Sequence, residues 1–231
     1  MATSNVHTLG TFFPDRANMW FAGAKFSSDV GHDGVGKINL GPALVAADPN
    51  GILSAQSIAS AQDIAASGFA STYSDSVMGR FGRNVNVDGS AASTAVITVY
   101  GFDYLGQPMY EEITMNGTTS VEGKKAFARV TRIVTGTDAD SALDVGWGNV
   151  LGLPYKLIDL ITELVDGLEP ADAGAVVKGI NTAQTATSAD SRGTYTPHAN
   201  NVPDGSKLHE LVGIWDNFSA VGLYGLAQYN G

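Results

Sequence analysis

The chain has 231 residues, of which 44% are hydrophobic and 16% are charged, and its formal net charge is −10. This composition predicts a globular protein with a sizeable core and excludes a disordered or coiled-coil chain. The acidity disfavours contact with nucleic acids and anionic membranes, which repel a negatively charged protein. Because the sequence contains no cysteine, disulfides, thiolate nucleophiles and zinc–thiolate sites are excluded.

The start of the sequence lacks a basic region followed by an apolar stretch, which is the pattern of a secretory signal. No run of about 18 apolar residues occurs further along, so the sequence predicts no membrane-spanning helix. We therefore expect synthesis in the cytoplasm and no membrane partner.

Residues 1–75 are predicted to form an extended, irregular arm and lead-in. Aromatic residues in the first part are separated by Gly, Pro and Asp, and they follow neither a helical nor a strand period. Because such rings usually find burial on a neighbouring domain or subunit, the arm is a candidate for partner contact. The candidate interface residues in it are Phe12, Phe13, Trp20 and Phe21.

Residues 54–67 are the best helical candidate in the first half of the chain, because they are rich in Ala and Ser and are followed by Gly68. Their apolar stripe consists of Ile58 and Ile64 alone. A strand or a loop is therefore almost as well supported as a helix.

From Gly82 onward, short alternating segments with β-branched residues predict strands. Residues 95–102 and 109–115 flank a segment with Asp, Gly and Pro, which predicts a hairpin. After a turn at Asn116-Gly117, residues 126–134 are expected to follow as the third strand of a meander. Residues 155–161 are compatible with a strand or a short helix. Further strands are predicted at 143–147, 175–180, 193–196, 208–215 and 223–227.

Many short strands joined by Gly, Asn, Asp and Pro at intervals of about ten residues are typical of all-β domains. We therefore predict an antiparallel β-sandwich, jelly-roll-like, over residues 76–231, with the extended irregular arm at residues 1–75. No strand–helix alternation or internal repeat supports a parallel α/β or solenoid fold.

Two patterns only partly match catalytic motifs. Residues 31–38 are close to a phosphate-binding loop, but Ile38 stands where that loop needs a hydroxyl group, and a Gly-rich loop is the preferred interpretation. Glu111 and Glu112 are adjacent, so on a strand they point to opposite faces and cannot form the facing pair of a glycosidase. We expect one of them to face solvent and the other to lie near a sheet edge or a subunit contact, and a simple solvated role is preferred over catalysis.

The candidate metal ligands also fail the spacing that metal sites need. Asp138, Asp140 and Asp144 crowd one turn, but Ala142, Leu143 and the absence of a Glu at the twelfth position break the calcium-loop pattern. The histidines, which are His7, His32, His198 and His209, have no paired spacing. We therefore expect no metal, no other cofactor and no catalytic residue.

The one concentration of basic residues comprises Lys124, Lys125, Arg129 and Arg132. Lysines at a sheet edge discourage unwanted strand pairing, so a solvated edge is the preferred interpretation. Docking against an acidic partner surface is the alternative, and for this reason Lys124 and Lys125 join the candidate interface residues.

Two blocks of the sequence carry a resemblance to a known family. The first block comprises residues 97–108, 111–113, 123–127 and 145–155, and the second comprises 190–197 and 203–205. A little is added by residues 79–85. The blocks cover roughly half of the chain, and none is a catalytic signature. They resemble virion structural proteins of tailed bacteriophages, in particular capsid decoration or cement proteins.

The resemblance implies a non-enzymatic subunit that is made in the host cytoplasm and assembles as a dimer or trimer on the outer capsid surface. There it would stabilise the shell by contacts with the major capsid protein. The acidity fits this location, because a net charge of −10 suits the outside of a particle better than its DNA-filled interior.

A glycan-binding head-fibre or tail attachment module is the alternative, because β-sandwiches with exposed Trp and Tyr often stack on sugars. Trp147, Tyr195 and Trp215 would be the stacking residues. Their position discriminates the two hypotheses, since exposure favours sugar binding and burial favours a decoration protein. A carbohydrate-cleaving enzyme ranks third, because it needs two facing carboxylates.

Overall fold

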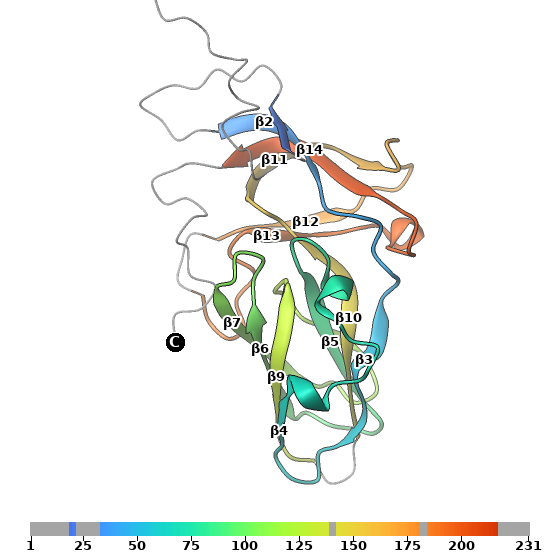
Figure 1. The fold of residues 1–231 in the computed structure, drawn as a ribbon, viewed down its shortest axis with the longest axis vertical. Helices are drawn as coiled ribbons and strands as arrows, with labels where there is room; N and C mark the ends of the chain where they lie inside the picture. Colours follow the sequence, from blue (N-terminus) through green and yellow to red (C-terminus); the bar gives the residue numbers. More distant parts are fainter. Residues whose placement is uncertain (1–18, 22–32, 139–141, 181–183, 217–231) are drawn as a thin grey trace, which may run out of the picture.

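The computed structural model describes residues 19–21, 33–138, 142–180 and 184–216. The described chain is all-β, with antiparallel sheets that pack as a β-sandwich (Figure 1). Its helical segments are three short 3-10 turns, and none of the described helices has the length and apolar character needed to cross a membrane.

The strands of the first half are β1 (Met19–Phe21), β2 (Asp33–Asn39), β3 (Asp48–Ser57), β4 (Asp63–Ala65), β5 (Arg83–Gly89), β6 (Val96–Phe102) and β7 (Pro108–Thr114). Those of the second half are β8 (Val121–Glu122), β9 (Arg129–Thr135), β10 (Ala142–Gly152), β11 (Lys156–Val165), β12 (Ala175–Lys178), β13 (Gly193–Thr196) and β14 (His209–Asp216). The 3-10 turns are η2 (Ala66–Gly68), η3 (Asp75–Met78) and η4 (Ala199–Asn201).

The described strands form three sheets. Figure 1 shows one sheet at the top, and below it β6 and β9 of the lower sheet lie beside β5 and β10 of the central sheet. The upper sheet has the order β1-β2-β14-β11, and the lower sheet has the order β4-β9-β6-β7. The central sheet has the order β12-β13-β10-β5-β8, and β3 pairs with β10. Because β10 is 11 residues long, it reaches from β3 at one end to β13 at the other.

The described chain has two hydrophobic cores, and each one packs against a different part of the central sheet. The larger core packs buried residues of β3, β5 and β10 against those of β6, β7 and β9, with Val145, Val99 and Ile133 among its members. The smaller core joins β10 and β13 to the upper sheet, and Trp215 and Leu211 are buried there. Along β6 and β7, buried and less buried residues alternate as a sheet with one covered face requires.

The strands β2 and β3 correct the prediction that residues 1–75 form an irregular arm. Both are paired in the sheets, β2 with β14 and β3 with β10. The predicted helix at 54–67 is also wrong, because β3 continues to Ser57 and β4 and η2 follow. Ile58 is fully buried in the larger core, so tertiary packing outweighs the weak helical preference of the Ala-rich segment.

The hairpin of β6 and β7 is confirmed, with Tyr100 opposite Tyr110, but the predicted meander is wrong. After β7 the chain crosses to the central sheet, where β8 pairs with β5, and it returns as β9 on the other side of β6. The free side of β7 is occupied near Glu112, whose N–H donates to the carbonyl of Ala186 at 2.9 Å. This contact leaves β6 as the available edge for β9.

The later strand predictions are largely confirmed. The strand β13 has the predicted bounds, β14 lies within one residue of them, and residues 156–165 form a strand (β11) instead of a helix. The pairing of β11 with β14 explains the outcome, because a ladder of backbone hydrogen bonds fixes the extended conformation. The predicted strand at 223–227 lies outside the described residues.

Buried charges hold the loops between the two cores. Arg192 and Asp103 form an ion pair of 2.8 Å, and each side chain is only 2% exposed. The other carboxylate oxygen of Asp103 accepts the N–H groups of Leu105 and Gln107, at 2.9 and 2.7 Å, and so fixes the β6–β7 turn. The Arg192 guanidinium lies 5.0 Å from the ring centre of Tyr104. The segment before β13 is thereby attached to the lower sheet.

We predict that Arg192→Met lowers the free energy of unfolding by about 3–5 kcal/mol, because it leaves the Asp103 carboxylate buried without a counter-charge. Urea denaturation of the purified protein measures this loss. The double variant Asp103→Asn with Arg192→Met should recover part of it, since an asparagine side-chain oxygen can still accept the turn N–H groups. A double variant as unstable as the single one would contradict this explanation.

Candidate interaction surface

The predicted interface residues of the arm are only partly described. Phe12 and Phe13 lie outside the described residues. Trp20 and Phe21 belong to β1, where their backbones pair with Lys37 and Gly36 of β2. At the backbone level, therefore, this part of the arm is an edge strand of the upper sheet.

Lys124 and Lys125 have different environments. Lys124 is exposed, and its Nζ donates to the carbonyl of Thr187 at 3.3 Å. Lys125 is fully buried, and its Nζ donates to the carbonyls of Tyr110 and Thr185 at 2.8 and 2.7 Å. Burial lowers the pKa of Lys125. The prediction of a solvated or partner-facing side chain is therefore wrong for Lys125, which ties the segment after β12 to β7.

Glu111 and Glu112 point to opposite faces of β7, as predicted, and Glu112 is exposed. Glu111 is 2% exposed and accepts the backbone N–H groups of Lys124 and Lys125, at 2.6 and 3.2 Å. Burial raises the pKa of the Glu111 carboxyl to about 7, although these hydrogen bonds and the Lys125 charge oppose the shift. The expected solvated role is wrong for Glu111, which holds the turn between β8 and β9.

The rings proposed for sugar stacking are all buried. Trp147, Tyr195 and Trp215 are exposed by 4%, 1% and 0%, respectively. The indole N–H of Trp147 donates to the carbonyl of Ala46 at 3.0 Å, and that of Trp215 donates to the carbonyl of Gly36 at 2.9 Å. These three side chains belong to the cores and offer no surface to a glycan.

The motif-like segments have structural roles where they are described. Most of residues 31–38 belongs to β2, so the Gly-rich segment is a strand rather than a loop. Asp144 accepts the N–H of Ala55 at 2.7 Å, and Asp140 lies outside the described residues. Within the described ranges, no group of three or more His, Asp or Glu side chains could hold a metal ion.

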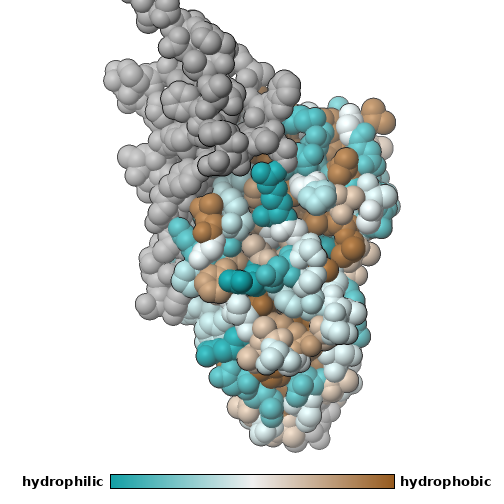
Figure 2. Space-filling view, in the orientation of Figure 1, coloured by the Kyte–Doolittle hydropathy of each residue, from teal (hydrophilic) through white to brown (hydrophobic). Residues whose placement is uncertain are grey.

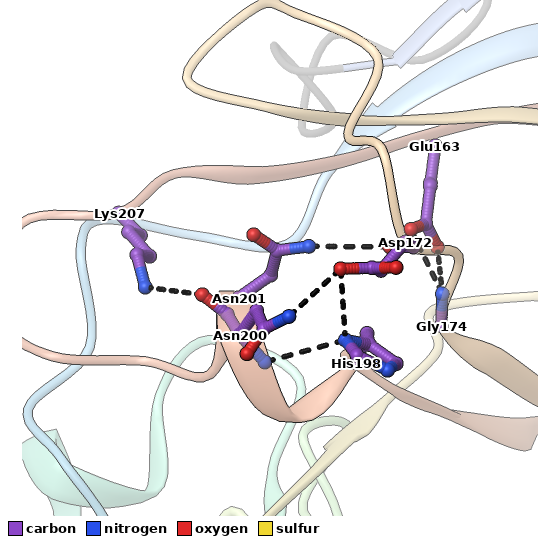
Figure 3. Close-up of polar contacts among 7 residues, drawn as sticks. All are labelled: Glu163, Asp172, Gly174, His198, Asn200, Asn201 and Lys207. Atoms are coloured by element: carbon purple, nitrogen blue, oxygen red, sulfur yellow. Dashed lines mark hydrogen bonds and ion pairs between the residues drawn. The ribbon is translucent and has the colours of Figure 1, made fainter.

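His198 belongs to an exposed polar cluster between η4 and the loop before β12 (Figure 3). The carboxylate of Asp172 accepts a hydrogen bond from the Asn200 side chain at 2.7 Å and lies 3.7 Å from Nδ1 of His198. Lys207 donates to the carbonyl of Asn200 at 3.1 Å. These contacts hold the η4 segment against the loop before β12. His209 is buried, and His7 and His32 lie outside the described residues.

The outward face of the lower sheet is the most distinctive surface of the described chain. Its side chains alternate with the residues of β6, β7 and β9 that fill the larger core. We call it the aromatic–arginine face, and its members are Asp63, Val96, Thr98, Tyr100, Phe102, Tyr110, Glu112, Arg129, Arg132 and Val134.

Cross-strand contacts fix the rings and guanidinium groups of this face. Tyr100 and Tyr110 stack with their ring centres 5.6 Å apart and an interplanar angle of 24°. The Arg132 guanidinium lies 4.2 Å from the ring centre of Tyr100, and that of Arg129 lies 4.8 Å from the ring centre of Phe102. Both arginines are exposed. Such cation–π contacts hold a guanidinium in place and leave its edge donors available.

A β-bulge places both arginines on this face. Residues three apart on a regular strand point to opposite faces, but Arg132 pairs with Tyr100 while Val130 pairs with the next residue, Gly101. The extra residue, Thr131, shifts the alternation. Gly101 permits the bulge, because a Cβ atom at this position would lie 2.0 Å from the Arg129 carbonyl oxygen.

The prediction from sequence identified Arg129 and Arg132 as part of a basic cluster, but it did not connect them with Tyr100, Phe102 and Tyr110. The alternation of 96–102 would have placed two of these rings on one face. The bulge that places the two arginines on the same face as these rings has no comparably clear signal in the sequence.

Comparisons with models of protein families, with curated proteins and with solved structures found no match. The aromatic–arginine face and the sequence resemblance are therefore the basis for proposing a function.

We predict that Glu111 makes stability depend on pH. Its carboxyl has a pKa of about 7 in the folded chain and about 4.5 when unfolded. The folded state therefore binds the proton more tightly, and wild-type stability should fall relative to Glu111→Gln as the pH rises from about 4.5 to about 7. Urea denaturation at several pH values measures the difference. A constant difference across this range would contradict the prediction, whatever the absolute stability of the variant.

Proposed function

We propose that this chain is a capsid decoration or cement protein of a tailed bacteriophage, which assembles on the outer shell and stabilises it by contacts with the major capsid protein. The sequence blocks described above suggest the family. The observation that carries an adhesive role is the aromatic–arginine face, in which Tyr100, Phe102 and Arg132 are presented on a rigid sheet.

Tyrosine and arginine are enriched among the residues that dominate protein–protein binding energies. Here the rings and guanidinium groups are already held in place, so binding immobilises few further side chains. Figure 2 shows hydrophilic and hydrophobic residues interspersed on the visible surface, and an interface between separately folded proteins has a similarly mixed composition. On a shell, many such modest contacts add up through multivalency.

A second contribution is proposed from the sequence of the arm. Phe12 and Phe13 lie before β1, and we expect these two aromatic residues to be buried against the shell or a neighbouring subunit. The buried positions of Trp147 and Trp215 favour this protein-binding role over the glycan-binding alternative that relied on them.

We predict that deleting residues 1–18 abolishes or strongly reduces retention on capsid shells, while every described strand remains encoded. Purified protein is mixed with shells lacking it, and co-sedimentation measures the bound fraction. The matched control is Phe12→Ser with Phe13→Ser in the full-length chain, which removes the rings and keeps the length. Undiminished occupancy for both variants would contradict the role of the arm, and failure of the wild-type protein to co-sediment would contradict the proposed function.

A further inference from the structure

We propose that the aromatic–arginine face binds a second copy of this chain face to face, across a two-fold axis that runs along β6. This inference deepens the proposed function, because it assigns the self-association of a decoration protein to one surface. Dimerisation is measured in solution without capsid shells, so this proposal and the proposed function can fail independently.

The charges of this face favour a second copy as its occupant. The chain has a net charge of −10, so two copies repel each other over most of their surfaces. The exposed charged residues of β4, β6, β7 and β9 are Asp63, Glu112, Arg129 and Arg132, and their charges cancel. Contact through this face therefore avoids most of the repulsion that other contacts would meet.

The charges are also separated across the face. The arginines stand on β9 and Glu112 stands on β7, with β6 and its rings between them. Among the described residues, Arg132 has one weak counter-ion, since its Nε lies 3.6 Å from the exposed carboxylate of Asp63. No ion pair of Arg129 is found among the described residues. A partner with acidic groups over β9 and basic groups over β7 would match this pattern.

A second copy supplies that partner by symmetry. A two-fold axis along β6 places β9 of each copy over β7 of the other, at the spacing of about 10 Å that facing sheets adopt. Arg132 then lies over the row of Tyr110, and Glu112 is the next outward residue along the same strand, about 7 Å away. With the sheet spacing included, the two Cα atoms lie about 12 Å apart, a distance that an arginine and a glutamate side chain span together, so two Arg132–Glu112 contacts form around the stacked tyrosines.

The size of the face predicts a weak dimer. Three seven-residue strands cover about 350 Å² in projection, which is less than the roughly 800 Å² per partner of a stable interface. Such a contact suits subunits that are concentrated on a shell and contribute through multivalency. Self-association should therefore be sought at protein concentrations up to about 1 mM.

A charge swap tests the proposal. Sedimentation velocity over a concentration series is expected to give a dimer for the wild-type protein. Arg132→Glu and Glu112→Arg, each alone, should raise the dimer Kd by about tenfold or more, because each places like charges together. The double variant should recover part of the lost affinity, because it exchanges the two charges but lacks the Arg132–Tyr100 contact and places a second carboxylate beside Asp63. Glu169→Arg is the matched control, because Glu169 is exposed outside the face and carries the same charge.

Circular dichroism confirms that each variant is folded before its Kd is compared. A monomeric wild-type protein at every concentration, or a dimer that both single variants leave intact, would overturn the inference. A double variant no better than the worse single variant would overturn it as well. If the single variants lower only the retention on shells, the face meets the capsid, and the proposed function survives without the face-to-face dimer.

Discussion

Buried charge between two hydrophobic cores is the constraint on which the arrangement of this chain depends. Asp103 and Arg192 neutralise each other, Glu111 accepts two backbone N–H groups, and Lys125 donates to two carbonyl groups from different segments. Arg83 is also fully buried and donates to the carbonyl of Gly148 at 2.8 Å. Such groups are tolerated in an interior only when their partners are in place, so each of them specifies one arrangement of loops.

This constraint bears on the surface as well as on the interior. The turn held by Glu111 lies between β8 and β9, and it delivers the chain to the position where β9 pairs with β6. The bulge at Thr131 then orients Arg129 and Arg132 toward the rings of β6. The exposed face is thus positioned by buried polar contacts on the opposite side of the same strands. Its rigidity follows from that support rather than from contacts among the surface residues alone.

Local patterns in the sequence predicted the fold class and most later strands, because alternation and turn residues act over a few positions. The hairpin of β6 and β7 is the clearest case. Local patterns did not predict β3, because its partner strand β10 lies about ninety residues away in the sequence and leaves no local signal. They also failed for Lys125, because its burial depends on Thr185, and for the arginine pair, because its orientation depends on Gly101.

The two ends of the described chain both belong to the upper sheet, where β1 and β14 pair with opposite edges of β2. Tension applied through the termini would therefore be borne first by the β1–β2 and β2–β14 ladders. The lower sheet and its core lie away from these two ladders, because their strands come after β2 and before β11 in the chain. Tension applied through the ends would thus strain the upper sheet first, while the aromatic–arginine face keeps its shape.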